Sequence, residues 1–145
     1  MKALIDRAVV QGLLLPRTHA ELYENLRHFY IYADEKGVGG CCALRVDNQD
    51  LAEVWALVVR EDLRGNLVGA ALLEACVADA RERGVRRVYA LSRTPAFFLR
   101  HSFQEIDRYE LPQKVARDCI QCHLFLHCES VAIIRDLTSA GDTPA

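Results

Sequence analysis

Apolar residues recur at helical spacing in several stretches of the chain, and these stretches are bounded by residues that start or stop a helix. Thr18 and Glu21 fit a capping box, in which a hydroxyl and a carboxylate satisfy free backbone amides at a helix start. The strongest helical pattern stops at Gly84, a residue suited to helix ends. The predicted helices are 1–11, a capped helix from Thr18, 67–83 and 95–100.

Aromatic and β-branched residues gather in shorter stretches between polar turns, which predicts β-strands. The predicted strands are 29–33, 38–46, 51–59, 85–91, 103–111 and 131–134. The stretch 51–59 is apolar almost throughout after Glu53, so we expect it to lie centrally in a sheet. Two hairpins followed by a strand–helix–strand crossover predict an α/β layered fold with a mixed, mostly antiparallel sheet.

Composition narrows the class of protein. The chain has 145 residues, of which 51% are hydrophobic and 26% charged, and this excludes a disordered chain. We expect one domain over 1–137, with a cysteine-containing C-terminal extension over 112–137, and a flexible tail over 138–145. The formal net charge of −2 argues against nucleic acid and anionic membranes as partners. With no apolar run long enough for a membrane span and no secretory signal, a cytoplasmic location is expected.

The six cysteines fall into two groups. A C-terminal group offers thiolates and imidazoles, and its Cys-x2-Cys pair is a typical half-site for Zn²⁺. Its members are Cys119, Cys122 and Cys128, with His123 and His127 between them. A structural zinc site and packed or surface thiols are both open alternatives, because a partner pair is lacking. Cys41, Cys42 and Cys76 lie in an expected strand and on an expected helix face, where we expect them to fill the core.

The segment 57–70 joins the buried strand to the long helix, and its residues suit a bound anion. Free amides at a helix start favour negative charge. Gly65 and Gly69 allow a ligand to approach the backbone, and Arg64 adds a positive charge. The alternative is an ordinary strand-to-helix turn. The segment matches neither a nucleotide-kinase loop nor a dinucleotide fingerprint.

This segment resembles the acetyl-CoA motif of the GNAT N-acetyltransferases, Arg/Gln-x-x-Gly-x-Gly/Ala, which here reads Arg64-Gly65-Asn66-Leu67-Val68-Gly69. The order of elements over 29–111 is also similar to the GNAT fold, with its first strand apparently missing. The resemblance implies that backbone amides of the loop cradle the coenzyme pyrophosphate, and that the preceding strand binds the acetyl and pantetheine groups. The implied coenzyme-binding residues are Leu57, Val58, Val59, Arg64, Gly65, Asn66, Leu67, Val68, Gly69 and Ala70.

Three positions depart from the GNAT pattern. Leu67 stands at a motif glycine, and Ser102 stands at a second glycine of the family. Phe98 occupies the place of a tyrosine that protonates the leaving thiolate in many members. Tyr109, Tyr89 and a water molecule remain alternatives for that proton donor.

Further blocks look like the short, kinase-less amino-acid N-acetyltransferases, the N-acetylglutamate synthases of bacterial arginine biosynthesis. These blocks are 12–18, 21–25, 41–44, 51–53 and 111–115. The resemblance implies that Arg17, Ser92 and Arg93 bind a dicarboxylate acceptor, with Lys114 as a weaker candidate; surface charge is the alternative for each basic residue. Trp55-Ala56 stands where close relatives are expected to carry Arg-Ser; packing of the tryptophan in the sheet and a change of acceptor are both open alternatives.

Acetyl transfer to an amino group requires a base that removes a proton from the ammonium. Glu53 is a charged residue early in an apolar strand, where a carboxylate is a better proton acceptor than in water. Its spacing matches the catalytic glutamate of several family members; the alternative is a carboxylate at the strand end that faces water or pairs with an arginine. The backbone amide near Leu57 is the expected donor to the acetyl oxygen.

The sequence therefore predicts a GNAT-fold enzyme that uses acetyl-CoA as co-substrate. Its small-molecule partner is expected to be an amino acid, first of all L-glutamate, acetylated on the α-amino group. The alternatives are a GNAT acetyltransferase acting on another amino acid or small amine, and a non-catalytic domain that binds acyl-CoA or a partner. A homodimer is left open.

Overall fold

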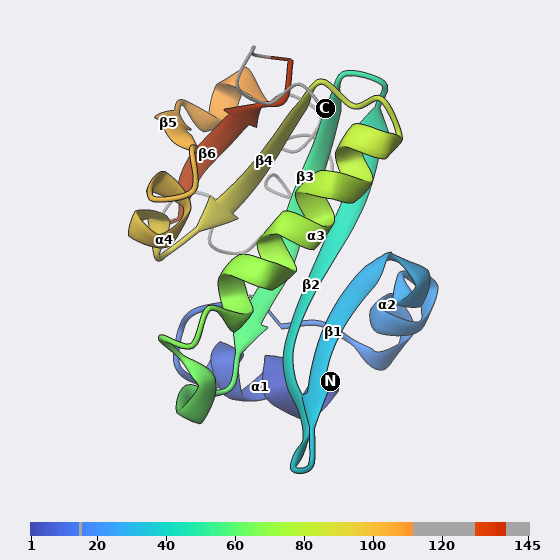
Figure 1. Cartoon of the computed structure of the whole chain (residues 1–145), viewed down its shortest axis with the longest axis vertical. Coiled ribbons are helices and arrows are strands. Elements are labelled where there is room, and N and C mark those ends of the chain that lie inside the picture. Colours follow the sequence, from blue (N-terminus) through green and yellow to red (C-terminus); the bar gives the residue numbers. More distant parts are fainter. Residues whose placement is uncertain (15, 112–129, 139–145) are drawn as a thin grey trace.

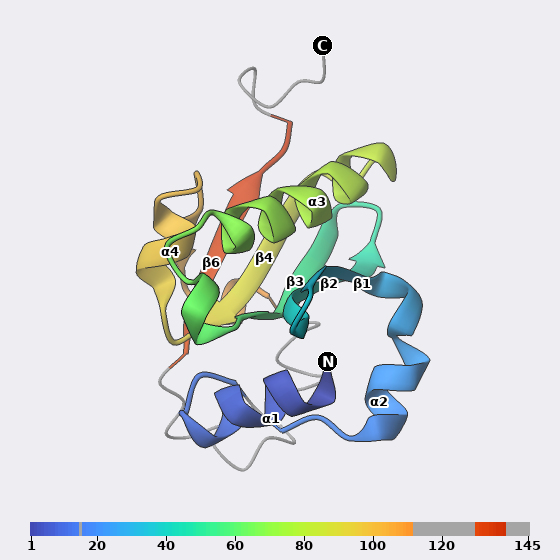
Figure 2. The ribbon, with the colours of Figure 1, turned by 60° about the horizontal axis from the view of Figure 1, so that its bottom comes forward.

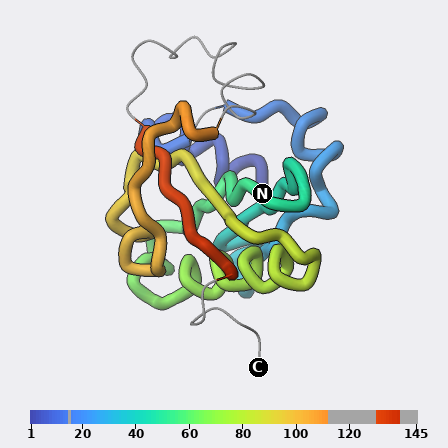
Figure 3. Tube along the Cα trace, turned by 90° about the horizontal axis from the view of Figure 1, so that it is seen from above, coloured from blue at the N-terminus to red at the C-terminus, as the bar shows by residue number. Residues whose placement is uncertain are grey.

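The computed structural model describes residues 1–14, 16–111 and 130–138. Within them, six strands form one sheet in the order β1-β2-β3-β4-β6-β5. The strands are β1 (Phe29–Asp34), β2 (Gly37–Asn48), β3 (Leu51–Val59), β4 (Arg87–Ser92), β5 (Gln104–Ile106) and β6 (Val131–Asp136). Neighbours are antiparallel except β3 and β4, which are parallel, so the predicted mixed sheet is confirmed. Figure 3 shows β6 lying between β4 and β5.

The helices lie on both faces of this sheet. They are α1 (Lys2–Val10), α2 (His19–Glu24), α3 (Val68–Glu82) and α4 (Pro95–Leu99), with 3₁₀ turns η1 (Leu26–His28), η2 (Glu61–Leu63) and η3 (Arg108–Glu110). In Figure 1, α3 crosses the sheet diagonally, and Figure 2 shows α1 on the opposite face. The predicted capping box is present at α2, where the Thr18 hydroxyl accepts from the Glu21 amide at 3.1 Å and the Glu21 carboxylate accepts from the Thr18 amide at 2.9 Å.

Helical periodicity explains why α3 packs against the sheet. Its buried residues recur at three- and four-residue spacing, so they share one face. Leu72, Leu73 and Val77 belong to a cluster with β2, β3 and β4 residues, and burying each such side chain contributes about 1.5–3 kcal/mol. Cys42 and Cys76 are fully buried in the same cluster, with their sulfur atoms 3.4 Å apart, which confirms their expected place in the core.

The opposite face of the sheet has two further clusters. One joins α1 to β2 and β3 and includes Ile5, Cys41 and Trp55. The other lies beside β4 and β6 and includes Tyr89 and Leu111. Among the described residues, no helix is long and apolar enough to cross a membrane.

The predicted strand over 103–111 is wrong in its second half. β5 ends at Ile106, because the carboxylate of Asp107 accepts a 2.9 Å hydrogen bond from the Tyr109 amide and starts η3 with a capping box. The hydrogen bond within the Asp107 turn therefore takes the place of strand pairing after Ile106.

Several expectations concern residues outside the described part of the chain. They are Lys114, the candidate zinc ligands Cys119, Cys122 and Cys128, the greater part of the extension over 112–137, and residues 139–145 of the tail. Within the described residues, no group of three or more His, Cys, Asp and Glu side chains is arranged to hold a metal ion.

Candidate active site

The two parallel strands separate halfway along the sheet. β3 and β4 pair at three positions, the last of which joins Glu53 to Tyr89. Beyond that point, the described sheet has no pairing between the remainder of β3 and β4. The backbone edge of β3 that faces β4 is therefore available to a ligand from residue 54 onward.

A β-bulge lies in this open stretch of β3. In the register with β2, Cys41 opposes Val58 and Ala43 opposes Trp55, so two residues of β3 stand against one of β2. Ala56, in the bulge, has a φ of 53°, in the left-handed region that side chains rarely adopt. A bulge bends its strand and redirects backbone groups, and here it does so beside the opening between the strands.

The thiol of Cys41 holds this bulge. Its Sγ donates a hydrogen bond to the carbonyl oxygen of Ala56 at 3.3 Å. Burial raises the pKa of the Cys41 thiol to about 12, so the thiol keeps the proton that it donates. Cys41 thus has a polar contact in addition to the packing role expected of it.

A cavity of about 360 Å³ occupies the opening between β3 and β4. Its wall is mostly apolar, and the polar groups in it belong to Trp55, Arg64, Ser92 and Thr94. The wall consists of Ala8, Leu13, Leu14, Val54, Trp55, Ala56, Leu57, Val58, Val59, Arg64, Gly69, Ala90, Leu91, Ser92, Thr94, Phe97 and Phe98. A mostly apolar cavity with few polar side chains suits the apolar arm of a ligand.

The start of α3 lies at the edge of this cavity. The first bond within the helix runs from the Ala71 amide to the Leu67 carbonyl at 3.0 Å, and no described side chain caps the amides before it. The free amides of Val68, Gly69 and Ala70, with the helix dipole, form a place for an anion. A Cβ at Gly69 would lie 3.4 Å from Val59 and 3.5 Å from Phe97, so glycine keeps space at the junction of loop and cavity.

The two positions that depart from the expected glycines have glycine-like backbone. Leu67 has a φ of 64° and Ser102 a φ of 69°. The fold therefore keeps the left-handed turns at both places although the residues carry a Cβ. Leu67 is 78% exposed, so its side chain points into solvent.

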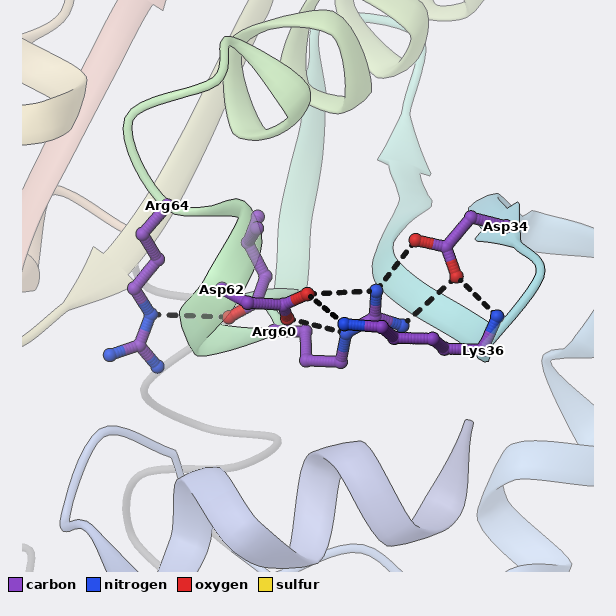
Figure 4. A network of polar contacts seen from close by, with 6 residues as sticks. Asp34, Lys36, Arg60, Asp62 and Arg64 are labelled. Atoms are coloured by element: carbon purple, nitrogen blue, oxygen red, sulfur yellow. Dashed lines mark hydrogen bonds and ion pairs between the residues drawn. The ribbon is translucent and has the colours of Figure 1, made fainter.

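An ion-pair network fixes the loop before α3, as Figure 4 shows. Arg60 donates to Asp34 in the β1–β2 hairpin and to Asp62 in η2, each at 2.6 Å. Lys36 lies 3.4 Å from Asp62, and Arg64 donates to the Val59 carbonyl at 3.2 Å. The hydrogen bonds from Arg60 hold the pKa of Asp62 at about 2 and lower that of Asp34. The network joins the hairpin to the loop and so limits the positions that the loop takes.

Glu53 is buried beside the cavity, with 2% of its surface exposed, and does not line it. It belongs to a row across three strands, since Arg45 of β2 and Tyr89 of β4 are its partners in the sheet register. The Tyr89 hydroxyl donates to Asp47 at 2.5 Å and lies 3.5 Å from a Glu53 oxygen. The carboxylates of Glu53 and Asp47 therefore both contact the hydroxyl of Tyr89.

Trp55 links Glu53 to the cavity. It lies two residues further along β3, on the same face of the sheet, and it lines the cavity. The guanidinium carbons of Arg17 and Arg45 each lie 5.0 Å from the centre of its ring. Phe29 meets the ring edge-on at 5.2 Å.

Ser92 and Arg93 stand at the end of β4. Ser92 lines the cavity, and its hydroxyl accepts from the Thr94 amide at 2.9 Å. Arg93 donates to the carbonyl oxygen of Gly12 at 2.8 Å, after the end of α1. This bond holds the residues that follow α1 near the mouth of the cavity.

The expected site residues thus divide by position. Those that line the cavity are Leu57, Val58, Val59, Arg64, Gly69 and Ser92. Those in the adjoining loop, helix start or sheet face are Arg17, Glu53, Gly65, Asn66, Leu67, Val68, Ala70 and Arg93. Leu13, Leu14 and Phe97 were missed as wall residues, and their apolar character alone does not distinguish them from core residues.

The candidate proton donors also differ in position. Phe98 is in the cavity wall and has no proton to give, whereas Tyr89 is buried and bonded to Asp47. Tyr109 is 61% exposed, in η3, and does not line the cavity. Among the described residues, the cavity wall therefore contains no tyrosine that could protonate a leaving thiolate.

Comparisons with known proteins agree with this arrangement. The family model described as the acetyltransferase (GNAT) family matches residues 4–103. An uncharacterized N-acetyltransferase of Chlorobaculum tepidum is 36% identical over 128 residues, which are 88% of this chain and 82% of the relative. The amino-acid acetyltransferase of Mycobacterium tuberculosis is 33% identical over 110 residues, 74% of this chain and 63% of the relative.

Solved structures show the same architecture. The N-acetylglutamate synthase from Neisseria gonorrhoeae, complexed with coenzyme A and N-acetyl-glutamate, has a TM-score of 0.84 and 29% identity over 94% of this chain. This chain covers only 32% of that synthase. A Mycobacterium tuberculosis protein in complex with CoA has a TM-score of 0.77 and 25% identity, with 94% of this chain and 91% of the other covered.

The splayed sheet and the uncapped helix start define an acyl-CoA N-acyltransferase fold. The chain belongs to the GNAT family of acetyltransferases. The expected fold and family are both confirmed, and the CoA bound in the neighbouring structures supports acetyl-CoA as the co-substrate.

Proposed function

We propose that this protein transfers the acetyl group of acetyl-CoA to the α-amino group of an amino acid, with L-glutamate as the first candidate. The product would then be N-acetylglutamate, an intermediate of arginine biosynthesis. The observation that carries the proposal is the cavity between β3 and β4, which runs from the free amides of α3 to the Trp55 face beside Glu53. Relatives named amino-acid acetyltransferase support the choice of acceptor.

The proposed binding of the co-substrate follows from the two ends of the cavity. The amides of Val68, Gly69 and Ala70, with Arg64, hold the pyrophosphate, while Gly65, Asn66 and Leu67 shape the turn. The apolar wall holds the pantetheine arm, and the open backbone edge at Leu57, Val58 and Val59 hydrogen-bonds it.

The proposed reaction is a direct attack. Glu53 takes a proton from the ammonium group of the acceptor, directly or through one water molecule. The amine nitrogen then forms a bond to the thioester carbonyl carbon, the carbon–sulfur bond breaks, and the nitrogen releases its second proton to water. A backbone amide near Leu57 stabilises the negative charge on the acetyl oxygen, and the leaving thiolate is protonated from water. Arg17, Ser92 and Arg93 hold the carboxylates of the acceptor.

Another amino acid or a small amine is the second candidate acceptor. Trp55 favours it, because an aromatic ring fills the position where close relatives are expected to carry arginine. A different pocket shape changes which side chain fits.

The test is to incubate the protein with acetyl-CoA and a panel of amino acids and amines, and to measure acetylated products by mass spectrometry. N-acetylglutamate formed faster than any other product supports glutamate, and a different major product supports the second candidate. Saturable acetyl-CoA binding without any product would overturn the enzymatic proposal in favour of a binding domain.

A further inference from the structure

The single tryptophan of the chain carries a buried N–H group that has no hydrogen-bond partner in the described part of the chain. Trp55 is 5% exposed, lines the cavity, and has a buried ring N–H with no hydrogen-bond partner among the described residues. Buried donors are nearly always paired in folded proteins, so an unpaired one beside a ligand cavity points to an acceptor atom supplied by the ligand.

Two cations approach the same ring. Arg17, which precedes α2, and Arg45 of β2 each place a guanidinium 5.0 Å from the indole centre. Within the described residues, Arg17 makes no hydrogen bond or ion pair, and its guanidinium contacts the Trp55 ring. A guanidinium held by an aromatic ring keeps N–H donors for a carboxylate, which it binds through two parallel bonds.

The base proposed for the reaction lies at a suitable separation from this group. Glu53 and Trp55 are alternate residues on one face of β3, so their backbones are about 6.6 Å apart. An α-amino acid carries its ammonium and α-carboxylate on one carbon atom. Neighbouring side chains on one face of a strand are close enough for the two charged groups of one such molecule to reach both.

We propose that Trp55 is a positioning residue that holds Arg17 beside the cavity and, with its own ring N–H, forms a carboxylate-binding wall for the acceptor. Arg45 adds positive charge to this wall. The proposal rests on the proposed function, because it assigns how the acceptor of that reaction is bound.

The first test uses intrinsic fluorescence, since Trp55 is the only tryptophan and its emission reports on this wall directly. In wild-type protein saturated with coenzyme A, added L-glutamate should change the emission in a saturable way. Arg17→Ala should abolish that change while the affinity for coenzyme A stays as in wild type. Arg27→Ala removes an exposed arginine from η1 and serves as the matched control, which should respond as wild type does.

The second test compares L-glutamate with two amides, L-glutamine and L-isoglutamine, which lack the side-chain and the α-carboxylate respectively. Wild-type kcat/KM should fall about tenfold or more for at least one amide, because a charge-assisted hydrogen bond is lost. Trp55→Ala should remove most of this discrimination, and Trp55→Phe, which keeps a ring under Arg17, should retain part of it. Adding Arg17→Ala to Trp55→Ala should cause little further loss of discrimination, because both substitutions remove the same carboxylate-binding arrangement.

Each outcome decides between the two proposals. If wild type acetylates no amino acid, the proposed function falls, and the positioning role of Trp55 falls with it. If wild type acetylates glutamate but Trp55→Ala keeps the full discrimination against the amides, only the positioning role falls. The positioning role alone is also overturned if the losses of kcat/KM from Arg17→Ala and Trp55→Ala multiply in the double variant. It is overturned likewise if Arg17→Ala keeps the emission change on addition of L-glutamate.

Discussion

The guanidinium of Arg93 donates a 2.8 Å hydrogen bond to the carbonyl oxygen of Gly12, which joins the end of β4 to the segment that follows α1. Leu13 and Leu14 of that segment form part of the cavity wall. One side chain from the far half of the sequence therefore holds a wall built by the first residues of the chain.

Replacing Arg93 with alanine should lower the free energy of unfolding by about 1–2 kcal/mol, because a partly buried charge-assisted hydrogen bond is lost. The same variant should raise KM for the acceptor, because it removes a proposed carboxylate-binding group and the hydrogen bond that holds the wall residues after α1. Urea denaturation and steady-state kinetics measure the two effects. Arg100→Ala, an exposed arginine just after α4, is the control; equal stability of both variants would show that the bond to Gly12 contributes nothing.

Leu67 is strained in its left-handed conformation, and glycine there should relieve it. Leu67→Gly should raise the free energy of unfolding by about 0.5–1 kcal/mol, the left-handed penalty less the added freedom of the unfolded chain. Little burial is lost, because the side chain is 78% exposed. Leu67→Ala keeps the Cβ and should show no gain; a stabilised alanine variant would mean that the side chain, and not the backbone, is the cause.

The Arg60 network should make stability depend on pH in the acidic range. The pKa of Asp62 in the folded protein is about 2, held below its usual value by the hydrogen bonds from Arg60. A carboxyl of lowered pKa stabilises the fold above its unfolded pKa, and this contribution disappears as the pH falls through the folded pKa. Stability should therefore decline between about pH 4 and pH 2.

In a series of thermal denaturation curves, Asp62→Asn should show a smaller decline of stability with falling pH than wild type. At pH 7 the variant should be less stable than wild type, and this difference should shrink in high salt, since Asp62 is exposed to solvent. Asp6→Asn, which removes a carboxylate from an exposed pair with Lys2 on α1, is a suitable control. A decline identical in wild type and Asp62→Asn would remove the network from the acid response.

The three buried cysteines should resist alkylation in the native protein. Burial raises the pKa of Cys41 to about 12 and that of Cys42 well above the ordinary value, and Cys76 is inaccessible beside Cys42. Treatment with iodoacetamide at pH 8 should leave all three unmodified, and the same treatment in denaturant should modify all three. Peptide mapping by mass spectrometry distinguishes them; native labelling of Cys41 would contradict its bond to the Ala56 carbonyl.

Local patterns in the sequence were sufficient to predict most of the described elements. β3 runs from Leu51 to Val59 as the run of apolar residues predicts, and the Thr18 capping box forms at α2. Both depend on residues close together in the chain. The candidate coenzyme loop 64–70 also rests on a motif of consecutive residues, and its role in binding stays a prediction.

Features that depend on contacts between distant parts of the chain could not be predicted from local sequence patterns. The separation of β3 from β4 after Glu53, and the bulge at Ala56, arise from pairing with strands elsewhere in the chain. The hydrogen bond from Arg93 to Gly12 joins residues far apart in the sequence, and no local pattern near either residue predicts it. The stacking of Arg17 and Arg45 on Trp55 likewise appears only when three separate segments come together.

Glu53→Gln gives the most direct test of acetyl transfer at this site. The substitution keeps the size of the side chain and removes its ability to take a proton. With the acceptor found to be acetylated fastest, kcat should fall about 10²–10⁴-fold, while the Kd for acetyl-CoA should stay within about twofold of wild type. A kcat equal to that of wild type would contradict the role of Glu53 as the base.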